Sequence, residues 1–290
     1  MTDLLREKIT RNKSASRLSA HVFTSTSHPM KSPPGATFSP TTATLIKGEH
    51  DSVLIDTLIA TEDVDKLADY IEQEGTSLRA ILITHGHPDH YFGADRLAAR
   101  FPGVRVAAAS GVADYIRKNR TAELALFEQL MDFEFVKPSL YPQVLASDVL
   151  ELEGEELHIV NVGQGDIAPS TVIWIPSLDT VVAGDVAYNS MHLMLGLTGV
   201  EEWRRWIESV KAIRALNPTT VIAGHKKPGA DNDAERVLRE TEAYIRDFSE
   251  ISARASSAQE IIANMTERYP NYPNLTILQM SAAAVMSVSG

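Results

Sequence analysis

The sequence of 290 residues contains no cysteine. The chain therefore has no disulfide framework and no thiolate that could bind a metal ion. Although 44% of its residues are hydrophobic, it also has no apolar run of the length that spans a bilayer. We therefore expect no membrane-spanning segment, and any metal site must be built from imidazole and carboxylate groups.

Basic residues are also scarce, because 27 Lys and Arg are outnumbered by 38 Asp and Glu, which gives a formal net charge of −11. Phosphate binding needs clustered cations, so we expect no nucleic-acid partner. The N-terminal stretch Met1–Ser19 lacks the continuous apolar core of a secretory signal. A cytoplasmic protein is the expectation, while the basic, serine-containing leader leaves organelle import open. The oligomeric state is also open.

Length and composition predict one large α/β domain with a helical tail. We divide the chain into an N-terminal leader and irregular approach over 1–40, a core over 41–230, and a C-terminal helical extension over 231–290 that packs on the core. Apolar runs predict strands over 41–46, 52–57, 78–84, 104–108, 157–162, 171–175, 180–183 and 219–223. Helical spacing predicts helices over 62–74, 91–101, 111–130 (one or two), 200–216 and 233–268, the last with a break near Ala255 and Ser256.

The most informative segment directly follows one of these apolar runs. From Ile83 to His90 the chain reads Ile-Thr-His-Gly-His-Pro-Asp-His. Three imidazoles and a carboxylate within six positions are ligands that zinc, iron or manganese accept. His85, His87, Asp89 and His90 therefore predict a metal site.

Two further apolar runs also end in a potential ligand. Residues 180–184 are followed by Asp185, and residues 220–224 by His225, just as residues 80–84 are followed by His85. In layered α/β proteins, ligands collect where loops leave the carboxyl ends of core strands. We therefore expect these three strand ends to meet at one pocket.

With these residues in place, the sequence resembles the metallo-β-lactamase superfamily. Its signature, His-x-His-x-Asp-His after a strand, matches His85, His87, Asp89 and His90. The resemblance covers roughly residues 40 to 230. It implies an αββα sandwich of two mixed β-sheets flanked by helices, with the metals at one edge and with 41–230 as the catalytic domain.

The resemblance also implies two metal sites that share a bridging carboxylate, Asp185. The second site would be held by Asp89, His90 and His225. The first would be held by His85, His87 and a ligand from the middle of the chain.

That middle ligand departs from the family pattern. Where the family has Gly-His-Thr, this chain reads Gly163-Gln164-Gly165-Asp166. Gln164 is then the candidate ligand, and since an amide carbonyl binds zinc less well than imidazole, the first site should be weaker or completed by water. Asp166 is close enough in the sequence to contribute.

Asp89 and Tyr188 are the candidate catalytic residues. Tyr188 lies three residues after Asp185, where lactone-hydrolysing members place a phenol; it would donate to a developing oxyanion, or else form a pocket wall. Asp56 resembles the family's carboxylate that accepts the N–H of a ligand histidine; the alternative is a strand-end turn residue. Residues 115–147 and 188–199 and the helical tail should determine specificity.

Two metal ions about 3.5–4 Å apart lower the pKa of a shared water molecule towards neutral pH, and they also polarise a substrate carbonyl. The function implied is a zinc-dependent hydrolase, with one or two zinc ions, that cleaves a small ester, lactone, thioester or amide by attack of metal-bound hydroxide. Iron and manganese suit the same ligands. An iron-dependent oxygenase or oxidoreductase, a β-lactamase-like amide hydrolase and a non-catalytic binding protein on the same fold stay open.

Overall fold

A computed structural model describes residues 5–9 and 16–288. Its larger sheet has the strand order β1 (Leu5–Ile9), β2 (Ser19–Thr24), β5 (Thr42–Lys47), β6 (Asp51–Ile55), β7 (Ser77–Ile83), β8 (Arg105–Ala108) and β9 (Gln143–Val144). The pairs from β1 to β6 are antiparallel, whereas those from β6 to β9 are parallel. The carboxyl ends of β6, β7 and β8 therefore lie at one edge.

The second sheet has the order β10 (Val149–Leu152), β11 (Glu155–Gly163), β12 (Ser170–Ile175), β13 (Thr180–Asn189) and β14 (Thr220–Lys226). Its pairs are antiparallel except β13 with β14, which is parallel. A short hairpin, β3 (His28–Pro29) with β4 (Thr37–Phe38), lies beside the two sheets.

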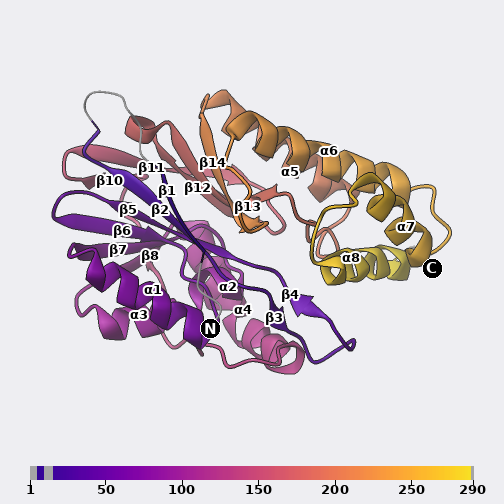
Figure 1. Ribbon diagram of the computed structural model, residues 1–290, viewed down its shortest axis with the longest axis horizontal. Helices are drawn as coiled ribbons and strands as arrows, with labels where there is room; N and C mark the ends of the chain where they lie inside the picture. Colours follow the sequence, from indigo (N-terminus) through magenta and orange to yellow (C-terminus); the bar gives the residue numbers. More distant parts are fainter. Residues whose placement is uncertain (1–4, 10–15, 289–290) are drawn as a thin grey trace.

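Helices cover the outer face of each sheet (Figure 1). The larger sheet carries α1 (Thr61–Gln73), α3 (Ala94–Arg100) and α4 (Ser110–Leu130), with the single turn α2 (Pro88–Tyr91) after β7. The second sheet carries α5 (Val200–Ala215) and α6 (Ala234–Ser252), whereas α7 (Ala258–Arg268) packs on α6, and α8 (Leu275–Val288) packs on α7 and the hairpin. A 3-10 turn, Pro176–Leu178, joins β12 to β13.

Alternation along the strands explains the layers. Val53 and Ile55 of β6 belong to the cluster between the two sheets, whereas Leu54 packs with the cluster under α1. The second sheet contributes Ile173 and Ile222 to the same central cluster, while its outer face packs on α5 and α6. The expected αββα sandwich is confirmed.

Three predicted elements differ from the structure. Residues 19–24, which we placed in the irregular segment 1–40, form β2, paired on both sides by β1 and β5. The expected helix 91–101 is divided into α2 and α3, and at the division the Gly93 N–H donates to the carbonyl oxygen of Leu58 at 3.2 Å and not to the preceding helical turn. The strand predicted over 180–183 extends to Asn189, and it is buried throughout.

The remaining predicted elements lie within a few residues of their observed bounds. Residues 111–130 lie in the single helix α4, and the helical extension breaks between α6 and α7 near the expected position. The predicted leader falls partly outside the described residues, which omit 1–4 and 10–15, and the C-terminal extension is described as far as residue 288. No helix in the described part of the chain combines the length and apolarity that a bilayer crossing requires.

Candidate metal centre

Two groups of potential metal ligands meet beside the end of β7, the middle of β13 and the last residues of β14. One consists of His85, His87, Asp166 and Asp185, and the other of Asp89, His90 and His225. Within each group the candidate ligand atoms all lie within 4.8 Å of one another. The histidine motif leaves the carboxyl end of β7 and enters α2 at Pro88, which suits the first position of a helix.

Asp185 lies between the two groups. Its Oδ2 is 3.9 Å from His85 Nε2 and 3.1 Å from His225 Nε2, and its Oδ1 is 3.2 Å from His90 Nε2. The register of β13 against β14 shifts on both sides of Gly184, which directs the Asp185 side chain to this point. The carboxylate therefore lies between the two groups, and its role as the bridging ligand stays a prediction from the resemblance.

Asp166, and not Gln164, faces the first histidines. Asp166 Oδ2 is 2.7 Å from His87 Nδ1, and its Oδ1 is 3.8 Å from His85 Nε2. The Gln164 amide donates to the carbonyl oxygen of Gly165, and the residue lines a separate pocket beside Arg205. The structure thus brings every predicted metal ligand together except Gln164, and it places Asp166, the other candidate, beside His85 and His87.

In three of the imidazoles, Nδ1, which faces away from the centre, forms a hydrogen bond with another group of the protein. Asp56 Oδ2 accepts from His90 Nδ1 at 2.8 Å, which is the contact that the resemblance implies for Asp56. Thr84 Oγ1 donates to Asp56, so it accepts from His85 Nδ1 at 3.0 Å. His225 Nδ1 donates to the carbonyl oxygen of Pro40 at 2.8 Å. In all three rings Nε2 is left to face the centre.

The centre contains buried polar atoms without hydrogen bonds. Among the described side chains, these include His85 Nε2, His90 Nε2 and Asp185 Oδ1, all at the point where the two groups meet. Burying such atoms unpaired is costly, and a divalent cation satisfies them together. The nitrogen and oxygen donors present here therefore fit a metal ion.

Burial and neighbouring acids act on the histidines in opposite directions. Burial lowers the pKa of His87, but the charge and hydrogen bond of Asp166 outweigh it and raise the pKa to about 9. For His90, burial is likewise outweighed, chiefly by Asp185 and Asp89, and its pKa lies well above the usual range. Burial in turn raises the pKa of Asp166 to about 6. The acidic groups therefore favour positive charge at the centre.

Both candidate catalytic residues adjoin the centre. The Tyr188 hydroxyl donates to Asp185 Oδ2 at 2.9 Å, and burial together with Asp185 raises the pKa of the phenol well above its usual range. Asp89 Oδ2 accepts from Thr41 Oγ1 at 2.8 Å and lies 3.4 Å from both His90 and His225. Tyr188 is therefore a protonated donor, and Asp89 is an acceptor.

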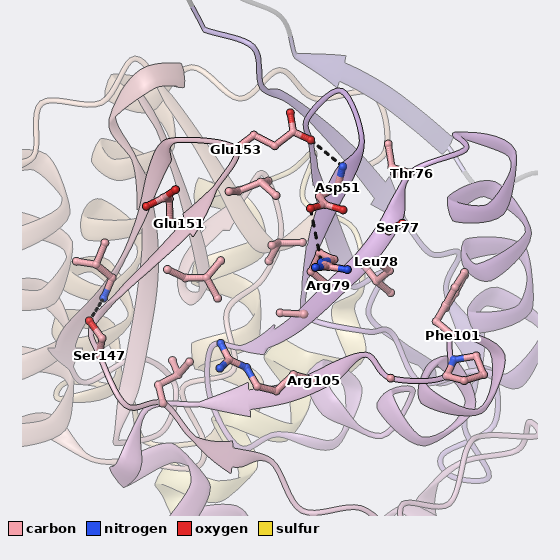
Figure 2. A pocket seen from close by; sticks show the side chains of 18 of the residues that line it. Asp51, Thr76, Ser77, Leu78, Arg79, Phe101, Arg105, Ser147, Glu151 and Glu153 are labelled. Atoms are coloured by element: carbon pink, nitrogen blue, oxygen red, sulfur yellow. Dashed lines mark hydrogen bonds and ion pairs between the residues drawn. The ribbon is translucent and has the colours of Figure 1, made fainter.

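These residues form the floor of a cavity of about 280 Å³. Its walls come from the β3–β4 hairpin, α4, the segment before α5, and α8. A larger cavity of about 1050 Å³ lies at the opposite edge, where β6, β7 and β8 begin (Figure 2). Asp51, Arg79 and Arg105 lie in this larger cavity, and no residue of the two ligand groups lines it. The candidate metal ligands therefore face the smaller cavity and not the larger one.

Sequence reasoning did not identify several residues that position the centre. Thr41 and the Pro40 carbonyl come from the start of the core, and they contact Asp89 and His225 over sequence separations of 48 and 185. No local pattern marks such contacts. Thr84, by contrast, directly precedes the motif, and its position next to His85 was a usable signal.

Comparison with known proteins agrees with this arrangement. The family model for the metallo-beta-lactamase superfamily matches residues 36–225. The chain is similar to a metallo-beta-lactamase family protein from Thermus thermophilus, with 19% identity and a TM-score of 0.63 over 92% of each chain. No curated protein matches it significantly.

Two further solved structures share the fold. The chain is similar to a metallo-beta-lactamase from Pontibacter korlensis, with 18% identity and a TM-score of 0.57 over 81% of this chain and 98% of that one. It is also similar to the metallo-beta-lactamase FIM-1 from Pseudomonas aeruginosa in its mono-zinc form, with 17% identity and a TM-score of 0.58 over 85% and 97%. Because the family model covers most of the chain, this protein belongs to the metallo-beta-lactamase superfamily.

Proposed function

We propose that the chain is a metal-dependent hydrolase of a small ester, lactone, thioester or amide, with zinc as its metal. The observation that supports this proposal is the position of Asp185 at the floor of a cavity: its carboxylate belongs to the first group and lies 3.2 Å from His90 Nε2 and 3.1 Å from His225 Nε2 of the second. In the proposal, one ion is held by His85, His87, Asp166 and Asp185. The other is held by Asp89, His90 and His225 together with Asp185.

Divalent cations bound there would acidify a water molecule and polarise the substrate carbonyl. The side chains of this protein supply the remaining steps. Asp89 accepts the proton of the attacking water and passes it to the leaving group, since its carboxylate lines the cavity. The Tyr188 phenol, which also lines the cavity, turns its O–H from Asp185 Oδ2 to the oxygen that becomes negative.

A matched pair of variants tests this proposal. Zinc-loaded wild type and Asp185→Ala are compared on ester, lactone and thioester panels, with Asp114→Ala as the control because the Asp114 side chain is exposed and pairs with Arg117 of the same helix. We expect hydrolysis by wild type and Asp114→Ala, and at least a hundredfold loss in Asp185→Ala. Equal turnover by all three proteins would exclude the proposed centre.

One observation favours iron as the alternative. With Asp166 beside His85 and His87, the first group offers two histidines and two carboxylates, Asp166 and Asp185, and such nitrogen and oxygen ligands also suit iron. Metal analysis of the purified, untagged protein separates the two functions. Stoichiometric zinc supports the hydrolase, whereas substantial iron with oxygen consumption supports an oxygenase.

A further inference from the structure

The walls of the 280 Å³ cavity are mainly apolar. Leu126, Phe127 and Leu130 project from α4, and Ile277 and Met280 from α8. Two hydrogen bonds hold α8 and the residue before it against the hairpin, one between Thr37 N and Thr276 Oγ1 and one between Asn274 and Ser39. The C-terminal extension therefore closes an apolar pocket above the candidate metal centre.

The charged side chain on the walls above the centre is acidic. Glu123 lies there, no Lys or Arg occurs among the described residues that line the cavity, and the imidazoles of His87 and His225 belong to its floor. Glu123 accepts from the Tyr115 hydroxyl at 3.1 Å and stays without a cationic partner within the pocket. A substrate carboxylate or phosphate placed along these walls would meet no opposite charge, so burying it would be unfavourable.

The apolar surface continues to the mouth of the pocket. Leu126 is 45% exposed and Leu197 53% exposed, and both also line the cavity. Met30, Met131, Met194 and Met280 line it as well. Methionine side chains are flexible and polarisable, and they adapt to apolar ligands of different shape. The pocket thus offers a continuous apolar path from the surface to the centre.

We propose that the substrate is an electrically neutral carbonyl compound with an extended aliphatic chain, which lies between α4 and α8 with its carbonyl at the centre. This inference rests on the proposed function for the cleaved bond, but the chain-binding pocket follows from the walls alone. It excludes substrates whose carboxylate must be bound inside the pocket, and it thereby disfavours the β-lactamase-like alternative for any such amide.

Binding of compounds that cannot be hydrolysed tests the pocket without catalysis. Calorimetric titration of the full-length protein, with zinc and after chelation, uses butanol, hexanol and octanol. It also compares the eight-carbon α,ω-diol with suberate, the eight-carbon α,ω-dicarboxylate. Because both ends of suberate are charged, a carboxylate enters the pocket in either orientation. We expect affinity to rise about fifteenfold for every two methylenes, and suberate to bind the metal-free protein at least tenfold more weakly than the diol.

A positive charge introduced at the mouth should reduce the preference for the neutral ligand over suberate. Leu126→Lys is expected to weaken octanol binding and to raise the affinity of the metal-free protein for suberate about two- to fivefold. Leu140→Lys is the matched control, because Leu140 is 39% exposed and does not line the cavity. This control should leave both affinities unchanged.

The outcomes separate this inference from the proposed function. Affinity that does not rise with chain length, or suberate that binds the metal-free wild type as tightly as the diol, overturns the inference. Tight, length-dependent alcohol binding without hydrolysis of any ester, lactone or thioester supports the pocket and contradicts the hydrolase. Hydrolysis at rates independent of chain length supports the hydrolase and contradicts the neutral aliphatic substrate.

Discussion

At the scale of single residues, Asp56 connects two parts of the centre through one carboxylate. It accepts from the backbone N–H and the hydroxyl of Thr84, and also from His90 Nδ1. It adopts this position with a φ of 58°, in the left-handed region that most residues avoid. The contact with His90 fixes its ring so that Nε2 faces the centre.

We predict that Asp56→Asn weakens metal binding about 10- to 100-fold, because an amide cannot accept from all three donors. Competition between the protein and a chromophoric chelator measures the affinity for Zn²⁺. Asp95→Asn is the control, since the half-buried Asp95 also accepts from backbone and hydroxyl donors, but these belong to Ser139. The same zinc affinity in wild type and Asp56→Asn would show that Asp56 does not orient a ligand.

Gly224 is a second residue on which the centre depends. A Cβ at this position would lie 2.0 Å from Asp185 Oδ1 and 2.7 Å from the carbonyl carbon of Gly184, so β13 and β14 approach too closely for any side chain. We predict that Gly224→Ala displaces Asp185, abolishes high-affinity zinc binding and destabilises the fold by about 1–3 kcal/mol. Zinc titration and urea unfolding measure these effects.

The comparison for this variant is Gly199→Ala. A Cβ at Gly199 would meet nothing closer than 3.4 Å, so this change should leave zinc affinity as in wild type. Wild-type zinc binding by Gly224→Ala would contradict the role assigned to the close strand approach.

The contiguous motif was readable from the sequence because its ligands are set by local spacing. His85, His87, Asp89 and His90 occur within six positions, and the strand before them was apparent from its apolar run. The sequence could not decide in this way whether Gln164 or Asp166 faces His85 and His87. Which of two nearby side chains turns inward depends on the backbone after β11, where Gly163 has a φ of 91° and the register against β12 shifts.

At the scale of elements, the turn between β10 and β11 is hydrogen-bonded to the turn between β5 and β6. Glu153 accepts from the backbone N–H groups of Glu49, His50 and Asp51, and thereby links the two sheets at the edge opposite the centre (Figure 2). These three hydrogen bonds lower the pKa of Glu153 from 4.5 to about 2. The ionised carboxylate therefore stabilises the folded state.

We predict that Glu153→Gln lowers the Tm near neutral pH, since one amide oxygen replaces two acceptors. Because the pKa in the folded state lies below its ordinary value, the stabilisation is complete above about pH 4.5 and is lost as the pH falls towards 2. The difference in Tm between wild type and variant should shrink across that range. Glu151→Gln, on the neighbouring strand, is the control; a difference that is independent of pH would contradict the explanation.

The loop between β13 and α5 is fixed by a buried histidine. His192 Nδ1 lies 2.9 Å from the Tyr244 hydroxyl of α6, and burial lowers the pKa of His192 from 6.5 to about 4. The unfolded chain therefore takes up a proton before the folded protein does as the pH falls through this interval. Stability that is present above pH 6.5 decreases by at most about 3 kcal/mol by pH 4.

We predict that His192→Gln reduces the loss of stability between pH 6.5 and 4, measured by urea unfolding at a series of pH values. His50→Gln provides the reference, because the His50 side chain is 80% exposed. A pH dependence in His192→Gln as steep as that of wild type would assign the effect to other groups.

Periodicity predicted most elements because their burial is one-sided. Helix α5 has its tryptophans on the buried face, and α1 has Val64, Leu67 and Ile71 at helical spacing. β13 is buried on both faces, so alternation gave no signal for its second half. The sequence did not predict β2, because residues 19–24 form a short run between a basic leader and a proline-rich segment. Its strand structure depends on pairing with β1 and β5.

At the scale of the whole molecule, the candidate centre joins the two sheets. His85, His87, Asp89 and His90 follow β7 of the larger sheet, whereas Asp166, Asp185 and His225 belong to the second sheet or the loop after β11. Glu153 makes the corresponding link at the opposite edge. Family resemblance predicted this sandwich correctly, but the walls of the cavity depend on α8, whose packing no motif described.

A cation bound between the sheets should therefore stabilise the entire fold. Ligands that bind only the folded state add about 2.7 kcal/mol at a free concentration a hundred times the Kd. We predict that Zn²⁺ raises the Tm of chelator-treated protein by several degrees, and that Asp185→Ala removes this shift. Ca²⁺ is the control, because it prefers six to eight oxygen ligands and should leave the Tm unchanged. If zinc, iron and manganese all left the wild-type Tm unchanged, the cluster would hold the sheets together by hydrogen bonds and ion pairs alone.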